Sequence, residues 1–208
     1  LLEQLMAIIT LAPPLADDLA RRPALFDALI DRSAHDLPES VPALQRAMQR
    51  AEPRGNYEAL LDRIRVVTGE ARFALGVQLI TGTHDPLDIA HGFAVVAEAA
   101  LQTALAGTVA EFAKAHGTIE GSEMVILGLG RLGGEALTHA SDLDIIYLFT
   151  GDHGAESDGE RPMSATRYYN RLAQRVGAAL SVPTAEGPLY EVDTRLRPQG
   201  AQGPLAVS

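Results

Sequence analysis

Two aspartates, Asp142 and Asp144, stand at the start of a strongly β-prone apolar run, LDIIYLF (residues 143–149). Because side chains alternate along a strand, the two carboxylates are expected on one face, and Leu143 and Ile145 on the other. Two carboxylates held a few ångströms apart repel each other unless a proton or a cation lies between them. The spacing therefore predicts a cation site at the start of this strand.

A third acid lies in the later stretch GPLYEVDTRLRP (residues 187–198), which predicts a strand that Pro198 ends. On this strand Asp193, Arg195 and Arg197 are expected to share one face. Three acids on two strands, with no histidine or cysteine beside them, offer only oxygen ligands. Oxygen ligands with room for water suit Mg²⁺, which also prefers partners that bring phosphate.

Each acid also has an ordinary structural explanation. Asp142 can cap a turn, and Asp144 can pair with an arginine in the core. Asp193 can form an ion pair with either of the two arginines that follow it. The three acids together, beside a glycine-rich turn and in front of apolar strands, favour the metal site.

The glycine-rich turn is GLGRLGG (residues 128–134), which follows the apolar run MVILGLG (residues 124–130). Glycines let the backbone approach a phosphate, and the first turn of a helix adds amide donors. The turn lacks the Gly-Lys-Ser/Thr of a Walker loop and the long crossover helix of a dinucleotide-binding unit. A short polar helix is expected between this turn and Asp142, and the combination with Ser-Asp-x-Asp predicts phosphate binding.

The elements before these motifs are predicted to be helical up to about residue 117. Pro13-Pro14 ends a first apolar helix, and apolar residues at three- and four-residue spacing from Tyr57 to Leu75 predict a second, longer one. Asp85-Pro86 predicts an N-cap and the first residue of a helix that ends near Gly117. The six histidines never lie four residues apart, so we expect surface or capping roles for them.

From Ser122 onward the pattern changes to strands. The strand runs 124–130, 143–149 and 187–198 are separated by a polar loop over 151–163 and a helix over 164–181. Strands separated by a helix predict an α+β fold with a mixed sheet and flanking helices. We therefore expect a helical subdomain over residues 1–117 and a catalytic core over residues 118–208.

Composition limits the classes of function. The chain has 208 residues, 47% of them apolar, and no cysteine, which excludes a disulfide scaffold or a thiolate metal site and fits a cytoplasmic protein. A formal charge of −10 argues against general nucleic-acid binding. No run approaches the roughly 18 uninterrupted apolar residues of a membrane span, so no membrane partner is expected. The chain opens on Leu1 and closes on an apolar run, so we expect a piece of a longer protein.

These motifs resemble a known family. Two glycines, a short helix, Asp-x-Asp on a strand and a later third Asp are similar to the nucleotidyltransferase motif of the DNA polymerase β superfamily. GLGRLGGEALTHASDLDIIYLF and YEVDTRLRPQGAQGPLAVS further resemble the glutamine synthetase (glutamate–ammonia ligase) adenylyltransferase family, and LAPPLADDLARRPALFDALID resembles its helical lead-in. The chain departs from that pattern at Arg131, where the family usually has lysine, and at Glu135, which stands one place early.

The resemblance implies a polymerase β-like core in a large bifunctional enzyme with two nucleotidyltransferase domains. In that family the C-terminal domain attaches AMP from ATP to a tyrosine of glutamine synthetase, and the N-terminal domain removes it by phosphorolysis. Glu191 favours the C-terminal, attaching domain. Catalysis by two Mg²⁺ ions on Asp142, Asp144 and Asp193 is implied. The residues expected at the nucleotide are Gly133, Gly134, Ser141, Arg195 and Arg197. A PII-type signal protein is a further expected partner of the full-length enzyme, and a non-catalytic nucleotide- or regulator-binding module is the alternative from another class.

Overall fold

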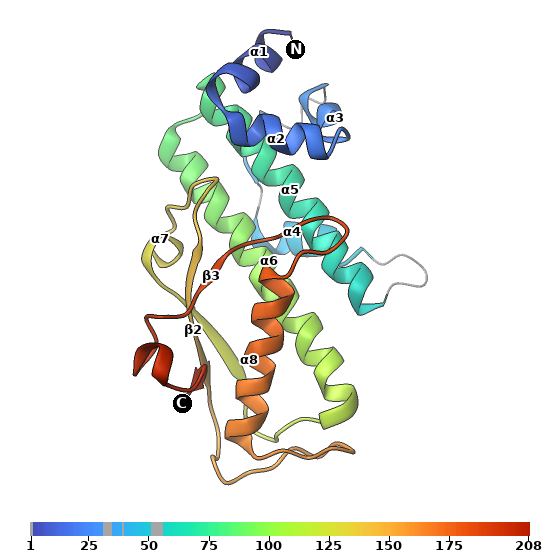
Figure 1. The fold of residues 1–208 in the computed structure, drawn as a ribbon, viewed down its shortest axis with the longest axis vertical. Helices are drawn as coiled ribbons and strands as arrows, with labels where there is room; N and C mark the ends of the chain where they lie inside the picture. The colour runs from blue at the N-terminus through green and yellow to red at the C-terminus, as the bar shows by residue number, and fades with distance from the viewer. Residues whose placement is uncertain (1, 31–34, 39, 51–55) are drawn as a thin grey trace.

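Two long antiparallel helices, α5 (Tyr57–Thr81) and α6 (Pro86–His116), form the spine of the molecule (Figure 1). The computed structural model describes residues 2–30, 35–38, 40–50 and 56–208. The smaller helices of the first half are α1 (Leu2–Leu11), α2 (Pro13–Arg21), α3 (Leu25–Ile30) and α4 (Val41–Met48). The first three gather at one end of the spine against α5, while α4 packs on both α5 and α6.

The boundaries of the spine helices follow from their capping residues. Asn56 accepts a hydrogen bond from the amide of Ala59 (2.9 Å), and α5 ends at Gly82 in the left-handed conformation, with φ of 65°. Asp85 caps α6 by accepting from the amide of Leu87 at 2.8 Å, and Pro86 is its first residue. The helix starts and stops predicted from the sequence are confirmed for α6, and Pro13 begins α2 as expected from the break after α1.

Helix α6 is the centre of the hydrophobic core. It packs against α4, α5 and α8 (Ala165–Ser181), and a row of its alanines from Ala97 to Ala104 is fully buried. Among the described helices it is the one long and apolar enough to cross a membrane, with a mean hydropathy of 1.5 over its most apolar window. Because 56% of that window is buried inside the protein, its apolar character is explained by the core that it forms.

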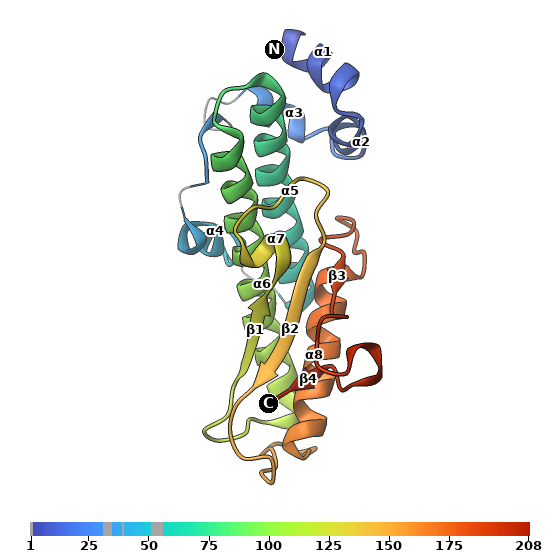
Figure 2. The same ribbon diagram turned by 90° about the vertical axis from the view of Figure 1, so that its left-hand side faces the viewer.

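A small mixed sheet shares one buried core with α6 and α8 (Figure 2). Its four strands are β1 (Met124–Gly128), β2 (Leu143–Phe149), β3 (Val192–Asp193) and β4 (Ala206–Val207). Strand β1 pairs antiparallel with β2, whereas β3 and β4 both pair parallel with β2. Burial alternates along β2, with Leu143 and Ile145 fully buried, so one face packs on the helices and the other is more open. The predicted α+β class, the mixed sheet and the first two strands are confirmed.

Two predictions about the second half are wrong. The predicted strand over residues 187–198 forms a strand only at Val192–Asp193, because the Asp193 side chain accepts the Arg195 amide (2.8 Å) and turns the chain. Arg195 and Arg197 therefore do not lie on a strand face with Asp193. The short helix α7 covers Gly130–Gly133 and thus coincides with the glycines, while residues 134–142 form turns and irregular chain.

The chain on both sides of residue 117 shares one core. Helix α6 ends at His116, close to the predicted boundary, yet one cluster of buried residues includes Phe93 of α6, Tyr147 of β2 and Leu172 of α8. The domain limits at residues 117 and 118 stay a prediction. His116 is the last residue of α6 and is buried, and its Nδ1 lies 2.9 Å from the carbonyl oxygen of Arg161. The predicted surface position is therefore wrong for this histidine.

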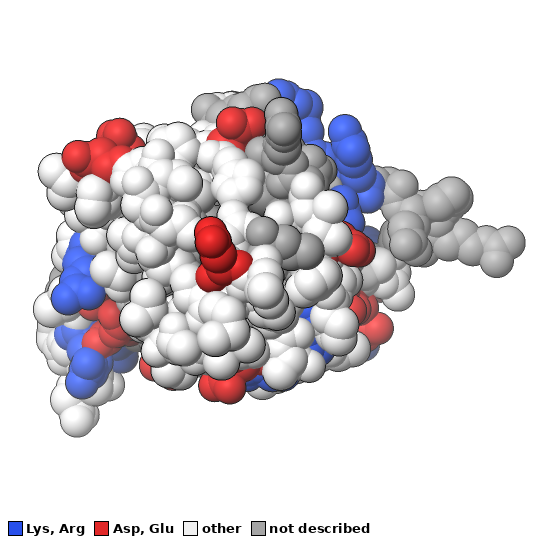
Figure 3. All heavy atoms as spheres, turned by 90° about the horizontal axis from the view of Figure 1, so that it is seen from above, with Lys and Arg blue, Asp and Glu red and all other residues white. Residues whose placement is uncertain are grey.

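Charged side chains are scattered over the end of the molecule that α1, α2 and α3 form. Seen from above, acidic and basic residues are dispersed over a mostly uncharged surface and do not gather into one basic patch (Figure 3).

Candidate active site

Asp142, Asp144 and Asp193 converge at one end of the sheet. One carboxylate oxygen of each residue lies within 4.8 Å of those of the other two. The pairing of β2 with β3 brings them together, since Asp144 lies opposite Asp193 in the parallel register, and the amide of Leu143 donates to the carbonyl of Glu191 at 2.9 Å. Asp142 stands immediately before β2 and is exposed. The structure thus assembles the three acids that the sequence analysis singled out.

The donor set fits a hard divalent cation. Three carboxylates offer oxygen ligands, which Mg²⁺ prefers, and the exposure of Asp142 leaves room for water or phosphate to complete a coordination shell. Within the described residues this is the one group of three acids or histidines close enough to share an ion. Mutual repulsion of the carboxylates is what a bound cation would relieve.

Arg195 already supplies one positive charge to this cluster. Its Nε donates to both carboxylate oxygens of Asp193 (3.0 and 2.8 Å), and its Nη2 donates to Oδ2. The hydrogen bonds from the side chain and then the amide of Arg195 lower the pKa of Asp193 to about 2. The same contact with Asp193, with smaller contributions from Asp142 and Asp144, raises the pKa of Arg195. The ion pair weighed as an alternative and the three-acid cluster therefore occur together.

The glycine turn packs directly against the acids. Gly130 has a φ of +52°, and a Cβ added there would lie 2.4 Å from Oδ2 of Asp144. A Cβ on Gly133 would lie 2.6 Å from the carbonyl oxygen of Gly128, so this glycine permits the tight return of the chain. The amides of Gly133 and Gly134 donate to the carbonyls of Leu129 and Gly130 within and just after α7. The contact of Gly133 and Gly134 with a nucleotide stays a prediction. Gly130, which the sequence analysis did not single out, is the glycine of this turn that lies against Asp144.

Ser141 and Arg197 stabilise the turns next to the acids. The Ser141 hydroxyl accepts from the amide of Thr138 at 3.0 Å and lies 2.9 Å from its hydroxyl, which closes the turn before Asp142. Arg197 donates through Nη1 to the carbonyl and the hydroxyl of Thr194, at 2.7 and 3.0 Å. Of the two predicted arginines, Arg195 is therefore the one that contacts the cluster.

A cavity of about 1070 Å³ opens beside Asp142. Its walls come from α2, α5, the turn before β2 and the segment before β3, including Asp18, Arg72, Ser141 and Tyr190. A volume of this size is typical of ligand sites. The helical half thus contributes walls to the space next to the acids, which the sequence pattern did not indicate.

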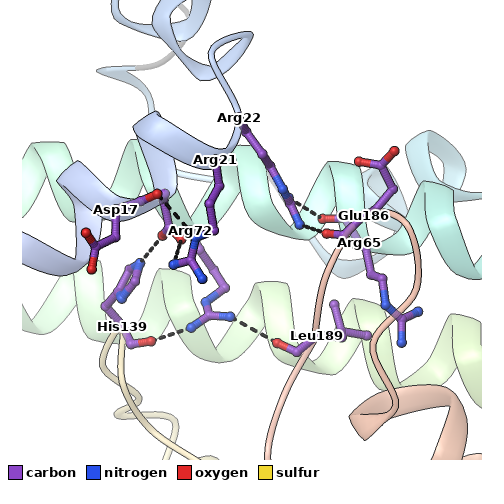
Figure 4. A network of polar contacts seen from close by, with 9 residues as sticks. Asp17, Arg21, Arg22, Arg65, Arg72, His139, Glu186 and Leu189 are labelled. Atoms are coloured by element: carbon purple, nitrogen blue, oxygen red, sulfur yellow. Dashed lines mark hydrogen bonds and ion pairs between the residues drawn. The ribbon is translucent and has the colours of Figure 1, made fainter.

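A network of polar contacts joins α2 and α5 to the segments that lead into the acids (Figure 4). His139 Nε2 lies 3.2 Å from Oδ2 of Asp18, and Arg72 donates to the carbonyls of His139 and Leu189. Burial alone would raise the pKa of Asp18, but the hydrogen bond and charge of His139, followed by the charges of Arg21 and Arg72, hold it below the ordinary value. These contacts link residues far apart in the sequence, so no local motif could have identified them.

The whole described core, including the acids and the glycine turn, matches one family. A family model described as glutamate-ammonia ligase adenylyltransferase covers residues 2–208. The chain belongs to the glutamate-ammonia ligase adenylyltransferase family. The resemblance inferred from the motifs is therefore confirmed at the level of the family.

Curated relatives of this adenylyltransferase family match the chain almost from end to end. A protein of Mesorhizobium japonicum is 43% identical over 208 residues, which are 99% of this chain and 21% of that protein. Proteins of Brucella melitensis and Agrobacterium fabrum are each 41% identical over the same shares of the two chains. All three are named bifunctional glutamine synthetase adenylyltransferase/adenylyl-removing enzymes. The chain spans about a fifth of the length of these relatives.

Proposed function

We propose that this chain is a nucleotidyltransferase core that transfers AMP from ATP to a tyrosine hydroxyl of glutamine synthetase. The observation that carries the proposal is the convergence of Asp142, Asp144 and Asp193 within 4.8 Å of one another, beside a glycine turn. Membership of the adenylyltransferase family supports the reaction class, and the names of the relatives support glutamine synthetase as the protein substrate. A cytoplasmic location belongs to the same proposal.

The polymerase β-like arrangement is part of this proposal. It is supported by a glycine turn after β1, two acids at the start of β2 and a third acid on the adjacent parallel strand β3. In this arrangement the catalytic core would begin near residue 118, and α6 and α8 would share the buried core beneath its sheet.

The cluster gives each residue a role in the reaction. Asp142, Asp144 and Asp193 would hold Mg²⁺, which when bound supplies charge stabilisation at the phosphates and lowers the pKa of the attacking hydroxyl. The tyrosyl oxygen bonds to the α-phosphorus as the bond to pyrophosphate breaks. Arg195, already drawn to the acids, is placed to offset negative charge on the leaving pyrophosphate. Gly130 keeps Asp144 in place by leaving no Cβ in its path.

The test is an AMP-transfer assay with glutamine synthetase, ATP and Mg²⁺. We expect the 208-residue chain to label glutamine synthetase and Asp144→Asn to lose at least about a hundredfold of that activity, since a ligand of the cation site is removed. Glu160→Gln, an exposed loop acid, is the matched control and should retain wild-type activity. Near-normal AMP transfer by folded D144N would contradict the assignment of Asp144 to the cation site.

The second candidate is removal of AMP by phosphorolysis, which the bifunctional names of the relatives favour as an alternative. In that reaction a phosphate oxygen attacks the α-phosphorus, the tyrosine hydroxyl is restored and ADP is released. Incubating the chain with adenylylated glutamine synthetase and phosphate separates the two. ADP formation without AMP transfer from ATP would assign the removing reaction to this chain.

A further inference from the structure

Arg72 connects the helical half to both segments that carry the acids. It projects from the middle of α5 and is partly buried. Its Nη1 donates to the carbonyl of Leu189 at 3.1 Å, and its Nη2 donates to the carbonyl of His139. The guanidinium carbon also lies 4.9 Å from the centre of the Tyr190 ring. One side chain therefore contacts both segments (Figure 4).

The two carbonyls that Arg72 binds lie just before the paired strands. Strands β2 and β3 run parallel, with Leu143 opposite Val192. His139 lies four residues before Leu143, and Leu189 lies three residues before Val192, so both carbonyls lie a few residues ahead of the paired strands. Neighbouring strands lie about 4.8 Å apart, a gap that the rigid fork of a guanidinium can bridge. Arg72 thus joins the two segments just ahead of the β2–β3 pairing, through one hydrogen bond to each segment.

This contact matters because the pairing itself is short. Strand β3 consists only of Val192 and Asp193, and the chain turns away directly afterwards. Few ladder hydrogen bonds therefore fix Asp193 relative to Asp144. Repulsion between the opposed carboxylates acts to separate the same two strands. A tie at the entrance to both strands opposes that separation.

We propose that Arg72 is a positioning residue for the cation site, which sets the distance between the Asp142–Asp144 segment and Asp193. Neither of its two main-chain bonds goes to a carboxylate of the cluster, so it acts through the backbone. The inference rests on the proposed function, in which the cluster binds a divalent cation.

The surroundings of Arg72 hold its two targets in place. Asp18 of α2 pairs with the His139 side chain at 3.2 Å, so that residue is held through both its ring and its carbonyl. Arg65 lies two turns before Arg72 on α5 and donates to the carbonyl of Gly187 at 2.9 Å. Arg65 and Arg72 of α5 therefore both bind the segment that leads into β3, and Arg72 also binds the segment that leads into β2.

The test measures Mn²⁺ binding to the 208-residue chain by electron paramagnetic resonance, with thermal unfolding recorded in parallel. We expect Arg72→Met to weaken Mn²⁺ binding about tenfold or more in the folded protein, a loss typical of residues that orient metal ligands. Arg72→Lys should fall between wild type and R72M, because one ammonium lacks the planar fork. It also serves as the test variant if R72M does not fold.

Arg63→Met is the matched control. Arg63 lies on the same helix and donates to one main-chain carbonyl, that of Ala47 at 3.2 Å, which belongs to α4. R63M should bind Mn²⁺ as wild type does. Wild-type affinity in folded R72M, or in R72K if only that variant folds, overturns the positioning role. If wild type binds no Mn²⁺, or Asp144→Asn binds it equally well, the proposed cation site fails instead.

Discussion

Asp144 and Asp193 lie directly opposite each other in the parallel pairing of β2 and β3. Like charges at opposed positions destabilise a sheet. Arg195 forms a salt bridge with Asp193, whereas no salt bridge to Asp144 is found among the described residues. The fold thus maintains a local repulsion at the place where a cation would be bound.

This repulsion predicts opposite effects of Asp144→Asn on stability and on cation response. With a chelator present, D144N should unfold at the same temperature as wild type or higher, because one of the opposed charges is removed. With Mg²⁺ added, the unfolding temperature of wild type should rise and that of D144N should not. Thermal unfolding followed by circular dichroism measures both. A D144N protein that is destabilised in chelator yet still responds to Mg²⁺ would contradict the prediction.

Gly130→Ala should disturb Asp144 directly. The alanine Cβ would collide with the Asp144 carboxylate, and a left-handed backbone costs an L-residue about 1–2 kcal/mol. We expect both lower stability and loss of the Mg²⁺-dependent rise in unfolding temperature. Gly121→Ala is the control, since Gly121 has a φ of +65° and nothing lies within 4 Å of its added Cβ. G121A should lose similar stability but keep the response to Mg²⁺; an equal loss of response in both variants would assign the effect to backbone strain.

Arg195→Gln should raise the pKa of Asp193 from about 2 toward its ordinary value of 3.8. In wild type the folded state binds fewer protons than the unfolded state between these two values, so stability falls as pH falls through this window. R195Q should lose less stability than wild type between pH 4 and pH 2. Carboxyl NMR titration of Asp193 and denaturant unfolding at each pH check the two parts. An unchanged Asp193 titration in R195Q would show that Arg195 is not the cause.

Arg65→Met should destabilise the chain more than Arg63→Met does. Arg65 is 1% exposed. It donates to the carbonyls of Leu61, Ala179, Val182 and Gly187. Methionine would remove the guanidinium from one buried and three partly buried hydrogen bonds to carbonyls, at a cost of about 3 kcal/mol or more, against about 1 kcal/mol for the single bond of Arg63. Denaturant unfolding of both variants measures the difference, and equal losses would mean that water replaces the buried guanidinium.

Local sequence was sufficient for the helix starts, the first two strands and the identity of the acids. Asp85-Pro86 specifies a helix start by itself, because a side-chain acceptor and a residue without an amide hydrogen satisfy the first turn. Apolar and acidic residues alternate at Leu143, Asp144 and Ile145, and this alternation specifies which face of the strand each side chain takes. The third strand was predicted too long, because the Asp193 side chain accepts a hydrogen bond from the Arg195 amide and turns the chain within the β-prone stretch.

The sequence by itself determined which residues could hold a cation, because carboxylate chemistry and strand periodicity are properties of neighbouring residues. Only the tertiary structure decided that Asp193 lies opposite Asp144, that Arg195 turns back onto it, and that Arg72 ties the two segments together. Main-chain carbonyls are present at every residue, so no sequence pattern marks the two that Arg72 binds. Which carbonyls Arg72 binds depends on how α5 packs against the segments that lead into β2 and β3, and this packing is set by the core as a whole.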